Sequence, residues 1–422
     1  MKEIYSTNIT SVISSLSQIL DFVDKVSMNH QLRVAFIAYN IAKEYGLKGN
    51  DLSNIALAGC LHDIGIFSTK DKLAFLEFEP GSKNLNLHCE LAFILLKDIT
   101  NLNEVAKIIR HHHVNFAETP YTNSDEIPIG SYVLHLADRI EVMVRKVHPV
   151  ILKRDDVIEY FKKNPNNMFM PDLIEAFVSL SNKKGFWFDL EYPKIEELVN
   201  GILPNFYLDF KGLMIFSNVI RKIIDYRSSF TAVHSVGVSA IASEIGKIFN
   251  LSDIEIKLLK LAGYVHDIGK LAVPVEILEK PGKLTKEEWP IMMSHAYYSY
   301  RILEKLEEVR IINLWGSLHH EKPNGLGYPF GLKEDELLLG SKIMSVADVL
   351  VAISEDRPYR KGLEPNNIKD ILSTMAKRKD LDPIVTEKVL KHFDDLISLR
   401  KKVQAEAKES YLELKEKINW HD

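Results

Sequence analysis

The sequence predicts an all-α protein made of two tandem helical domains, and three observations support this fold class. Apolar residues recur at helical spacing along most of the chain, whereas no convincing set of alternating strands occurs. A cluster of His and Asp residues occurs twice, in the same order and at nearly the same spacing. The 422 residues, 46% of them hydrophobic, are enough for two or three packed domains.

The first half of the chain shows helical periodicity up to about residue 147. From Ile9 onward the apolar side chains line one stripe of a helix, and Gly46 marks the end of the second helix. A loop with Pro120 and Pro128 precedes the last helix of this half. The expected helices span residues 9–26, 32–45, 52–64, 90–96, 102–113 and 131–147.

The rest of the chain is also predicted to be helical. Prolines divide residues 154–203 into several helices, and a new helical series begins at Leu213. The last residues are strongly charged with helical spacing, which is typical of a solvated helix. The predicted organisation is a domain over 1–200, a linker over 201–212, a domain over 213–400 and a charged helix over 401–422.

Seven His and Asp residues in each half form the internal repeat. The first step is 32 residues in both halves (30 to 62, 234 to 266), and the step to the paired His is 24 in both (88 to 112, 295 to 319). The flanking sequences LAGCLHDIG and LAGYVHDIG also agree. The members are His30, His62, Asp63, His88, His112, His113 and Asp138, followed by His234, His266, Asp267, His295, His319, His320 and Asp348. Because chance would not keep this spacing, we interpret the chain as a duplicated helical domain.

The repeated residues predict a metal centre. A single His is more often a surface or core residue, but the shared spacing changes that expectation. Imidazole and carboxylate ligands suit iron, manganese, nickel or zinc. Seven ligands are too many for one tetrahedral zinc, so we expect two metal ions bridged by an Asp. Such a pair activates a water molecule and neutralises a phosphoryl oxygen, as phosphoester hydrolysis requires.

Composition and charge argue against other classes of protein. A net charge of -5 disfavours binding of a DNA or RNA duplex through a basic surface. The two cysteines, Cys60 and Cys89, indicate a reducing compartment and not a disulfide framework. No signal peptide follows Met1, and no apolar run reaches the length of a membrane span. We therefore expect a soluble, cytoplasmic protein without a membrane partner, and the sequence leaves a homodimer open.

The residues around His266 resemble the HD superfamily of metal-dependent phosphohydrolases. In the second half, HHEKPNGLGYP (residues 319–329) and ADVLVAISEDRPYRKG (residues 347–362) are similar to two motifs of its HD-GYP subgroup. This resemblance covers roughly residues 213–400, with several motifs in the right order. The first half resembles the parent HD domain only, because VNFAETPY stands where the GYP loop is expected.

The resemblance implies a signalling enzyme that hydrolyses cyclic di-GMP to linear pGpG, and often on to GMP, with two iron or manganese ions. The seven residues of the second half would then hold the metal ions, and those of the first half would form a second candidate site. Asp267 and Lys270 would be catalytic, with Lys270 touching the scissile phosphate or the leaving group. The remaining candidates for substrate contacts are Gly325, Gly327, Tyr328, Arg357 and Arg360.

Three positions depart from the family pattern. Phe230 stands where members with three metals carry a Glu, which favours two metals. Val351 replaces a second Asp, and Ile66 occupies the lysine position of the first half. We therefore expect the active site in the second half, with a first half that hydrolyses cyclic dinucleotides poorly or not at all. The alternatives are a 3′,3′-cyclic GMP-AMP phosphodiesterase, a receptor that binds the dinucleotide without cleaving it, and a general nucleotide phosphohydrolase.

Overall fold

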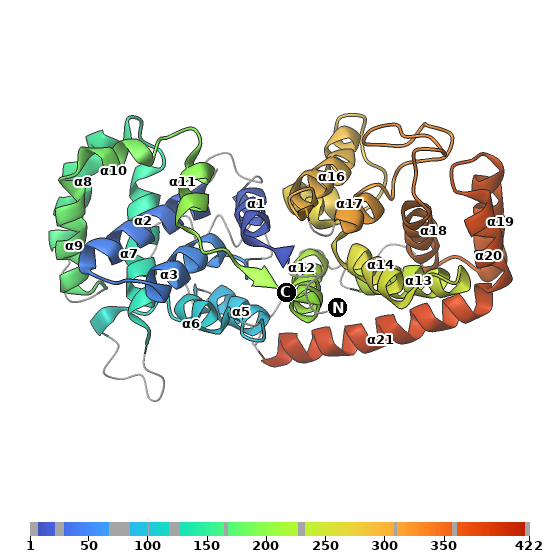
Figure 1. Ribbon diagram of the computed structural model, residues 1–422, viewed down its shortest axis with the longest axis horizontal. Coiled ribbons are helices and arrows are strands. Elements are labelled where there is room, and N and C mark those ends of the chain that lie inside the picture. The colour runs from blue at the N-terminus through green and yellow to red at the C-terminus, as the bar shows by residue number, and fades with distance from the viewer. Residues whose placement is uncertain are drawn as a thin grey trace. The chain divides into compact units, whose positions relative to one another are not determined.

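The computed structural model consists almost entirely of α-helices, so the predicted all-α fold is confirmed (Figure 1). It describes residues 7–21, 29–66, 85–99, 101–117, 127–163, 168–226, 233–307, 310–356 and 361–417. Two short strands, β1 (Thr7–Asn8) and β2 (Tyr207–Leu208), pair with each other. The chain divides into two compact units, one of residues 8–208 and one of residues 209–422 with residues 1–7. The segment 201–212, expected as a linker, contains β2 and the start of a helix.

The unit of residues 8–208, blue to green in Figure 1, is built around α2, which contacts α3, α7 and α9. Most residues of α2 are buried, because the helix is surrounded on several sides. The helices are α1 (Thr10–Asp21), α2 (His30–Tyr45), α3 (Asn50–Leu61), α5 (Leu85–Leu96), α6 (Asn103–Arg110), α7 (Ile129–Val144), the 3₁₀ helix η3 (Val150–Lys153), α8 (Arg154–Lys163), α9 (Pro171–Ser181), α10 (Lys184–Asp189) and α11 (Ile195–Ile202).

The second unit repeats this plan around α13, which contacts α14, α18 and α21. Ser252 begins α14 with a capping box, since its hydroxyl accepts from the Glu255 backbone N–H and the Glu255 carboxylate accepts in return. The helices are α12 (Phe210–Tyr226), α13 (His234–Ile248), α14 (Asp253–Val265), the 3₁₀ helix η4 (Ile268–Ala272), α15 (Val275–Leu278), α16 (Glu288–Leu303), α17 (Arg310–Ser317), α18 (Leu339–Ser354), α19 (Pro365–Lys377), α20 (Pro383–Lys391) and α21 (Phe393–Lys417).

A glycine lets the first two repeat helices of each unit approach closely. A Cβ on Gly59 of α3 would lie 2.4 Å from the Cα of Ala35 on α2, and one on Gly263 of α14 would lie 2.5 Å from the Cα of Ser239 on α13. A side chain at either position would push the helices apart. Because each glycine lies three residues before the His-Asp pair, the crossing brings that pair close to the first His of its unit.

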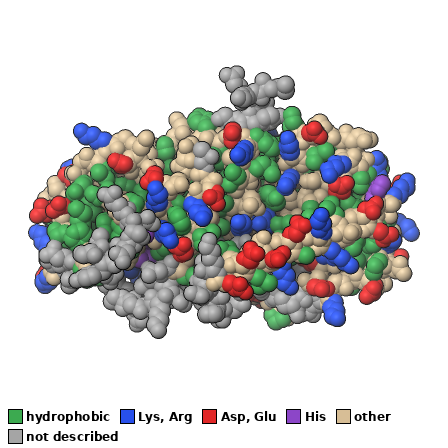
Figure 2. Space-filling model, turned by 90° about the horizontal axis from the view of Figure 1, so that it is seen from below, with side chains coloured by type: hydrophobic (Ala, Val, Ile, Leu, Met, Phe, Trp, Pro, Cys, Tyr) green, Lys and Arg blue, Asp and Glu red, His purple; other side chains and the backbone are tan. Residues whose placement is uncertain are grey.

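The charged C-terminal segment belongs to a longer helix than expected. Helix α21 begins at Phe393, and residues 418–422 lie outside the described part. From residue 401 onward nearly all described side chains are exposed or intermediate, as expected of a solvated helix, and only Gln404 among them is buried. Leu396 and Arg400, which precede the predicted bounds, are also buried. No helix among the described residues is long and apolar enough to cross a membrane. On the face drawn in Figure 2, acidic and basic side chains are interspersed.

Candidate metal centres

The seven predicted residues of the second half lie together in one buried cluster. They come from three helices and from the turns that follow two others: His234 (α13), His266 and Asp267 (after α14), His295 (α16), His319 and His320 (after α17) and Asp348 (α18). These donors form overlapping groups, the main ones being His234, His266 and Asp348 on one side and His295, His319 and His320 on the other.

Asp267 lies between the two groups. Its Oδ2 is 3.1 Å from the Nε2 atom of His266, and its Oδ1 is 3.4 Å from that of His295 and 3.9 Å from that of His319. Asp348 faces the first group, with its Oδ1 3.0 Å from the Nε2 atom of His234. The carboxylate of Asp267 therefore presents one oxygen to each group, as a bridging ligand would.

Backbone carbonyls orient the imidazole rings toward the cluster. His266, His295 and His319 each donate from Nδ1 to the carbonyl three residues earlier, at 2.9, 2.5 and 2.7 Å. The same bond holds His62 and His112 of the first unit, at 2.9 and 2.7 Å. This bond sets the tautomer and leaves the Nε2 lone pair facing inward, which is the usual arrangement of a metal-binding histidine.

Buried atoms without partners show that a cation fits this cluster. His266 Nε2, His295 Nε2 and Asp267 Oδ1 are buried and have no hydrogen-bond partner among the described residues. Unsatisfied buried polar atoms are rare in native proteins, and three of them within one cluster fit the binding of cations there. Nitrogen and oxygen donors of this kind suit divalent transition metals.

The pKa values of the cluster are shifted by burial and by the charged groups that lie close together in it. Burial alone would raise the pKa of Asp267, but the charges of His266 and Lys270 hold it well below its usual range. Burial lowers the pKa of His319 to about 3. Burial would also lower the pKa of His234, but Glu355 and Asp348 raise it to about 10. Asp267 is thus ionised and His295, His319 and His320 are neutral, which are the protonation states that metal ligands need, whereas the raised pKa of His234 reflects the two carboxylates beside it.

Lys270 lies beside the cluster. Helix α14 ends at Val265, and Lys270 belongs to the following 3₁₀ helix η4. Its Nζ atom is nevertheless 2.6 Å from Asp267 Oδ2. The tighter 3₁₀ turn brings residues three apart onto one side, and this places Lys270 beside Asp267.

The loop after His320 is held by one buried carboxylate. Glu321 is 1% exposed, and its two oxygens accept from the backbone N–H groups of Phe330, Gly331 and Leu332 at 2.6, 3.2 and 2.9 Å. A Cβ on Gly327 would lie 2.4 Å from the backbone nitrogen of Lys322, so the loop folds back on itself at this glycine. Sequence reasoning missed Glu321, although it directly follows the two histidines.

The other predicted substrate contacts have varied surroundings. Gly325 adopts a φ of 77°, which explains a glycine in that turn. The ring of Tyr328 stacks on that of His320, with centroids 4.7 Å apart and an interplanar angle of 27°. This favours a packing role for Tyr328 over base stacking. Arg357, Arg360 and Phe230 lie outside the described residues.

A second carboxylate supports the first histidine of each unit, and its position in the sequence differs between the two units. In the second unit His234 Nδ1 is 3.1 Å from Oε1 of Glu355, and Gln404 of α21 donates to Oε2 of Glu355 at 3.1 Å. In the first unit Glu141 plays this part, 2.5 Å from His30 Nδ1. Glu141 lies three residues after Asp138, where the second unit has the buried Val351. In the second unit the carboxylate comes from Glu355, the residue directly after the end of α18, so the missing acid at Val351 does not leave His234 unsupported.

The donors of the first unit also gather, but with other neighbours. Asp63 Oδ2 is 3.6 Å from His30 Nε2, and Asp63 Oδ1 is 3.4 Å from His62 Nε2. Asp138 is paired with Arg139, whose Nη2 donates to it at 2.5 Å; the second unit has Val349 there. Ile66 donates only its backbone N–H, to the carbonyl of Asp63. The internal repeat could not have indicated Arg139, because the equivalent residue of the second half is Val349.

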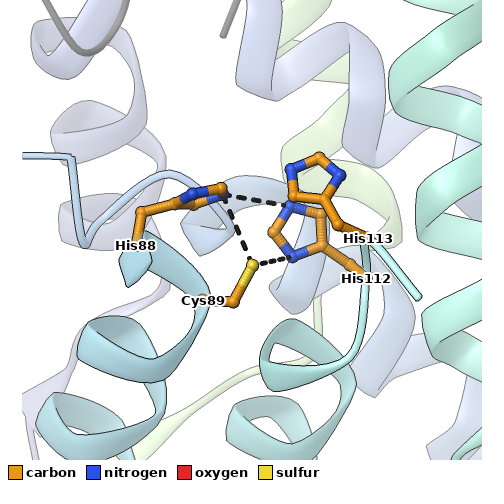
Figure 3. Close-up of side chains that lie close together, drawn as sticks. All are labelled: His88, Cys89, His112 and His113. Carbon is orange, nitrogen blue, oxygen red and sulfur yellow. Dashed lines mark hydrogen bonds between the residues drawn. The ribbon is translucent and has the colours of Figure 1, made fainter. Parts of the chain in front are cut away.

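Cys89 joins the remaining donors of the first unit, as Figure 3 shows. Its Sγ lies 3.6 Å from His88 Nε2 and 3.5 Å from His112 Nδ1, and His113 completes the group. Burial holds the pKa of the Cys89 thiol well above its ordinary value. Neither Cys60 nor Cys89 forms a disulfide, as expected. Sequence reasoning missed Cys89 as a candidate ligand, although it directly follows His88.

Comparisons with known proteins identify both units. HD domain models match residues 13–143 and residues 218–385. The chain is 27% identical over 406 residues to the 3′3′-cGAMP-specific phosphodiesterase 1 of Vibrio cholerae, covering 92% of both proteins. A cyclic di-GMP phosphodiesterase of Pseudomonas aeruginosa is 38% identical over 148 residues, which are 34% of this chain and 36% of that protein.

A solved structure shares the fold. The crystal structure of a cyclic GMP-AMP specific phosphodiesterase of Vibrio cholerae matches with a TM-score of 0.65 at 22% identity, covering 92% of this chain and 98% of the other. The protein therefore belongs to the HD-domain family and carries two HD domains in tandem. The predicted resemblance to HD phosphohydrolases is confirmed.

Proposed function

We propose that the second HD domain hydrolyses a phosphodiester bond of a cyclic dinucleotide at a two-metal centre. The observation that carries this proposal is the buried cluster around Asp267, in which two groups of inward-facing donors share one carboxylate. His234, His266 and Asp348 would hold one ion, and His295, His319 and His320 the other, with Asp267 between them. Two bound divalent ions, iron or manganese in our proposal, supply an activated water molecule and neutralise phosphoryl oxygens.

Lys270 places a positive charge beside the proposed metal ligands, which are neutral imidazoles and negative carboxylates. Its ammonium group lies against Asp267 and is part exposed, so it can reach a phosphate at the edge of the cluster. Cleavage of a phosphodiester builds negative charge on the phosphoryl and leaving oxygens, which a nearby cation stabilises more in the transition state than in the ground state.

The rim of the cluster offers an apolar surface for a nucleobase. Trp289 of α16 is 49% exposed, and its ring centroid is 6.4 Å from that of Tyr328. Leu326, on the loop anchored by Glu321, is 78% exposed. Exposed aromatic and apolar side chains beside a buried polar site are typical of ligand pockets, where they bind flat rings.

The substrate favoured here is 3′,3′-cyclic GMP-AMP, because the relative that matches both HD domains is named as specific for it. The motifs had favoured cyclic di-GMP as the substrate, with 3′,3′-cyclic GMP-AMP as an alternative, so the order of these two candidates is reversed. Cyclic di-GMP remains the second candidate, since relatives that match 34% of the chain are named for that substrate. Nothing in the loop residues themselves separates guanine from adenine.

The test is an assay of the purified protein with manganese or iron against a panel of cyclic dinucleotides, with products separated by chromatography. We expect a linear dinucleotide to form faster from 3′,3′-cyclic GMP-AMP than from cyclic di-GMP. Faster cleavage of cyclic di-GMP would instead identify cyclic di-GMP as the preferred substrate. Binding of either compound without any cleavage would instead support a receptor, and hydrolysis of ordinary nucleotides only would support a general phosphohydrolase.

A further inference from the structure

The first HD domain carries a sulfur donor that the second lacks. Cys89 follows His88 on α5, and the equivalent residue, next to His295 on α16, is Ala296. The Cys89 side chain is 1% exposed, and its Sγ points between the rings of His88 and His112 (Figure 3). A small apolar residue fills this place in the second domain, so packing alone does not require a thiol.

Two spacings between the donor atoms match those of ligands on one tetrahedral ion, and the donor atoms of all four residues lie within 4.8 Å of one another. With metal–nitrogen and metal–sulfur bonds of about 2.0 and 2.3 Å, two nitrogens lie about 3.3 Å apart and a nitrogen and a sulfur about 3.6 Å apart. His88 Nε2 and His112 Nε2 are 3.4 Å apart, and Cys89 Sγ is 3.6 Å from His88 Nε2. The Nδ1 atom of His112 donates to the Ile109 carbonyl, so Nε2 is its ligand atom.

A second observation points to an ion in this domain. His62 Nε2 is buried and has no hydrogen-bond partner among the described residues, while its Nδ1 donates to the Gly59 carbonyl. The ring of His62 meets that of His112 edge to face, with centroids 5.4 Å apart. Its unsatisfied nitrogen therefore belongs to the same polar interior as the cysteine.

We propose that the first HD domain binds a thiophilic ion, zinc above all, in a site made of His88, Cys89, His112 and His113. Thiolate ligands favour zinc over harder ions such as manganese, so the two domains select different metals. Arg139 already neutralises Asp138, which lowers the negative charge available for a second ion in this domain. On binding, the Cys89 thiol gives its proton to solvent and forms a bond to the metal, with no change of oxidation state.

Cobalt is a direct probe of this site, because cobalt bound to a thiolate gives a charge-transfer absorption that nitrogen and oxygen ligands do not. The full-length protein, stripped of metal, is titrated with Co²⁺ and then with Zn²⁺. Wild type is expected to develop the band and to lose it when zinc displaces cobalt. Cys89→Ala, which copies Ala296, should lose the band and bind zinc at the first domain at least about tenfold more weakly, as for a lost metal contact.

Cys60→Ala is the matched control, because it removes the chain's other buried cysteine, on α3. It should keep the band. The proposal is overturned if wild type shows no band, if Cys60→Ala abolishes it, or if a folded Cys89→Ala variant binds zinc as tightly as wild type. Circular dichroism checks folding. The absorption does not depend on turnover by the second domain, so this test stands whatever substrate that domain cleaves.

Discussion

At the scale of the residue, the two HD domains differ at positions beside their ligands. The backbone turn after the His-Asp pair is the same in both, since the N–H of Lys270 donates to the Asp267 carbonyl and that of Ile66 to the Asp63 carbonyl. Only the second domain places an ammonium group there. The first domain instead has a guanidinium, that of Arg139, against another carboxylate. The scaffold is shared, and the position of the cation distinguishes the sites.

Lys270→Ile tests the importance of that cation by copying the first domain. Turnover of the cyclic dinucleotide should fall roughly 10²-fold or more, the scale of losing one electrostatic contact at such a centre. Metal content and dinucleotide binding should persist, because the side chain is not a proposed ligand. Steady-state kinetics and metal analysis provide the measurements. Lys260→Ile, on the exposed side of α14, is the control, and equal turnover in both variants would contradict a catalytic role.

The support of His234 by Glu355 gives a second prediction at this scale. Glu355→Gln keeps the shape but loses the charge that holds the His234 ring and raises its basicity. Metal affinity of the second domain should fall roughly 10- to 100-fold, as for other partners of metal-bound histidines. Competition with a chelator measures this affinity. The exposed Glu364→Gln is the control, and unchanged affinity in Glu355→Gln would show that Gln404 and the helix suffice to orient His234.

At the scale of the element, the loop after His320 behaves as one unit anchored by Glu321. Three backbone N–H groups converge on one carboxylate, and Asn324 ties the loop to residues 378–380 through its backbone and side chain. The loop carries Tyr328, whose ring lies on His320. Its shape therefore affects both the rim of the cluster and one proposed metal ligand.

Glu321→Ala should disorganise this loop. The three N–H groups that lose their acceptor are only part-buried and can turn to water, so stability should fall by about 1–3 kcal/mol in total. We expect a lower melting temperature, a higher KM for the dinucleotide and faster proteolytic cleavage within residues 321–335. Glu334→Ala removes an exposed ion pair with Lys379 and should cost well under about 1 kcal/mol. Equal losses in the two variants would rule out an anchoring role.

At the scale of the whole molecule, the duplication has produced two sites with different donor sets. Each unit holds its own cluster, and each cluster is complete without residues of the other unit. One domain combines Lys270 with the loop that Glu321 anchors, and the other combines the part-buried Arg139 with Cys89. We infer a division of labour, in which the second domain performs hydrolysis.

Single substitutions at equivalent histidines test this division. His266→Ala should abolish dinucleotide hydrolysis, because it removes a proposed ligand of the hydrolytic centre. His62→Ala should leave much of the activity, since its domain lacks the lysine. Both are measured in the same assay, with circular dichroism and metal analysis to confirm folding and loading of the second domain. Loss of hydrolysis in a folded, loaded His62→Ala protein would contradict the division.

The sequence by itself determined the helical architecture, the duplication and the residues that gather in each cluster. Helix periodicity and motif spacing are local properties of the chain, so the His-Asp pairs could be recognised before any contact was known. Their roles as metal ligands stay a prediction. The ends of elements were less predictable, because α14 stops at Val265 and a 3₁₀ turn, not the same helix, carries Lys270.

Only the tertiary structure decided which groups surround the clusters. His234 and Glu355 are 121 residues apart, and His30 and Glu141 are 111 apart, so no local pattern pairs them. Glu141 lies within α7, whereas Glu355 directly follows the end of α18. Cys89 is a donor only because α5 and the turn after α6 bring its sulfur to His112. Long-range packing places such partners, and packing depends on all the helices together.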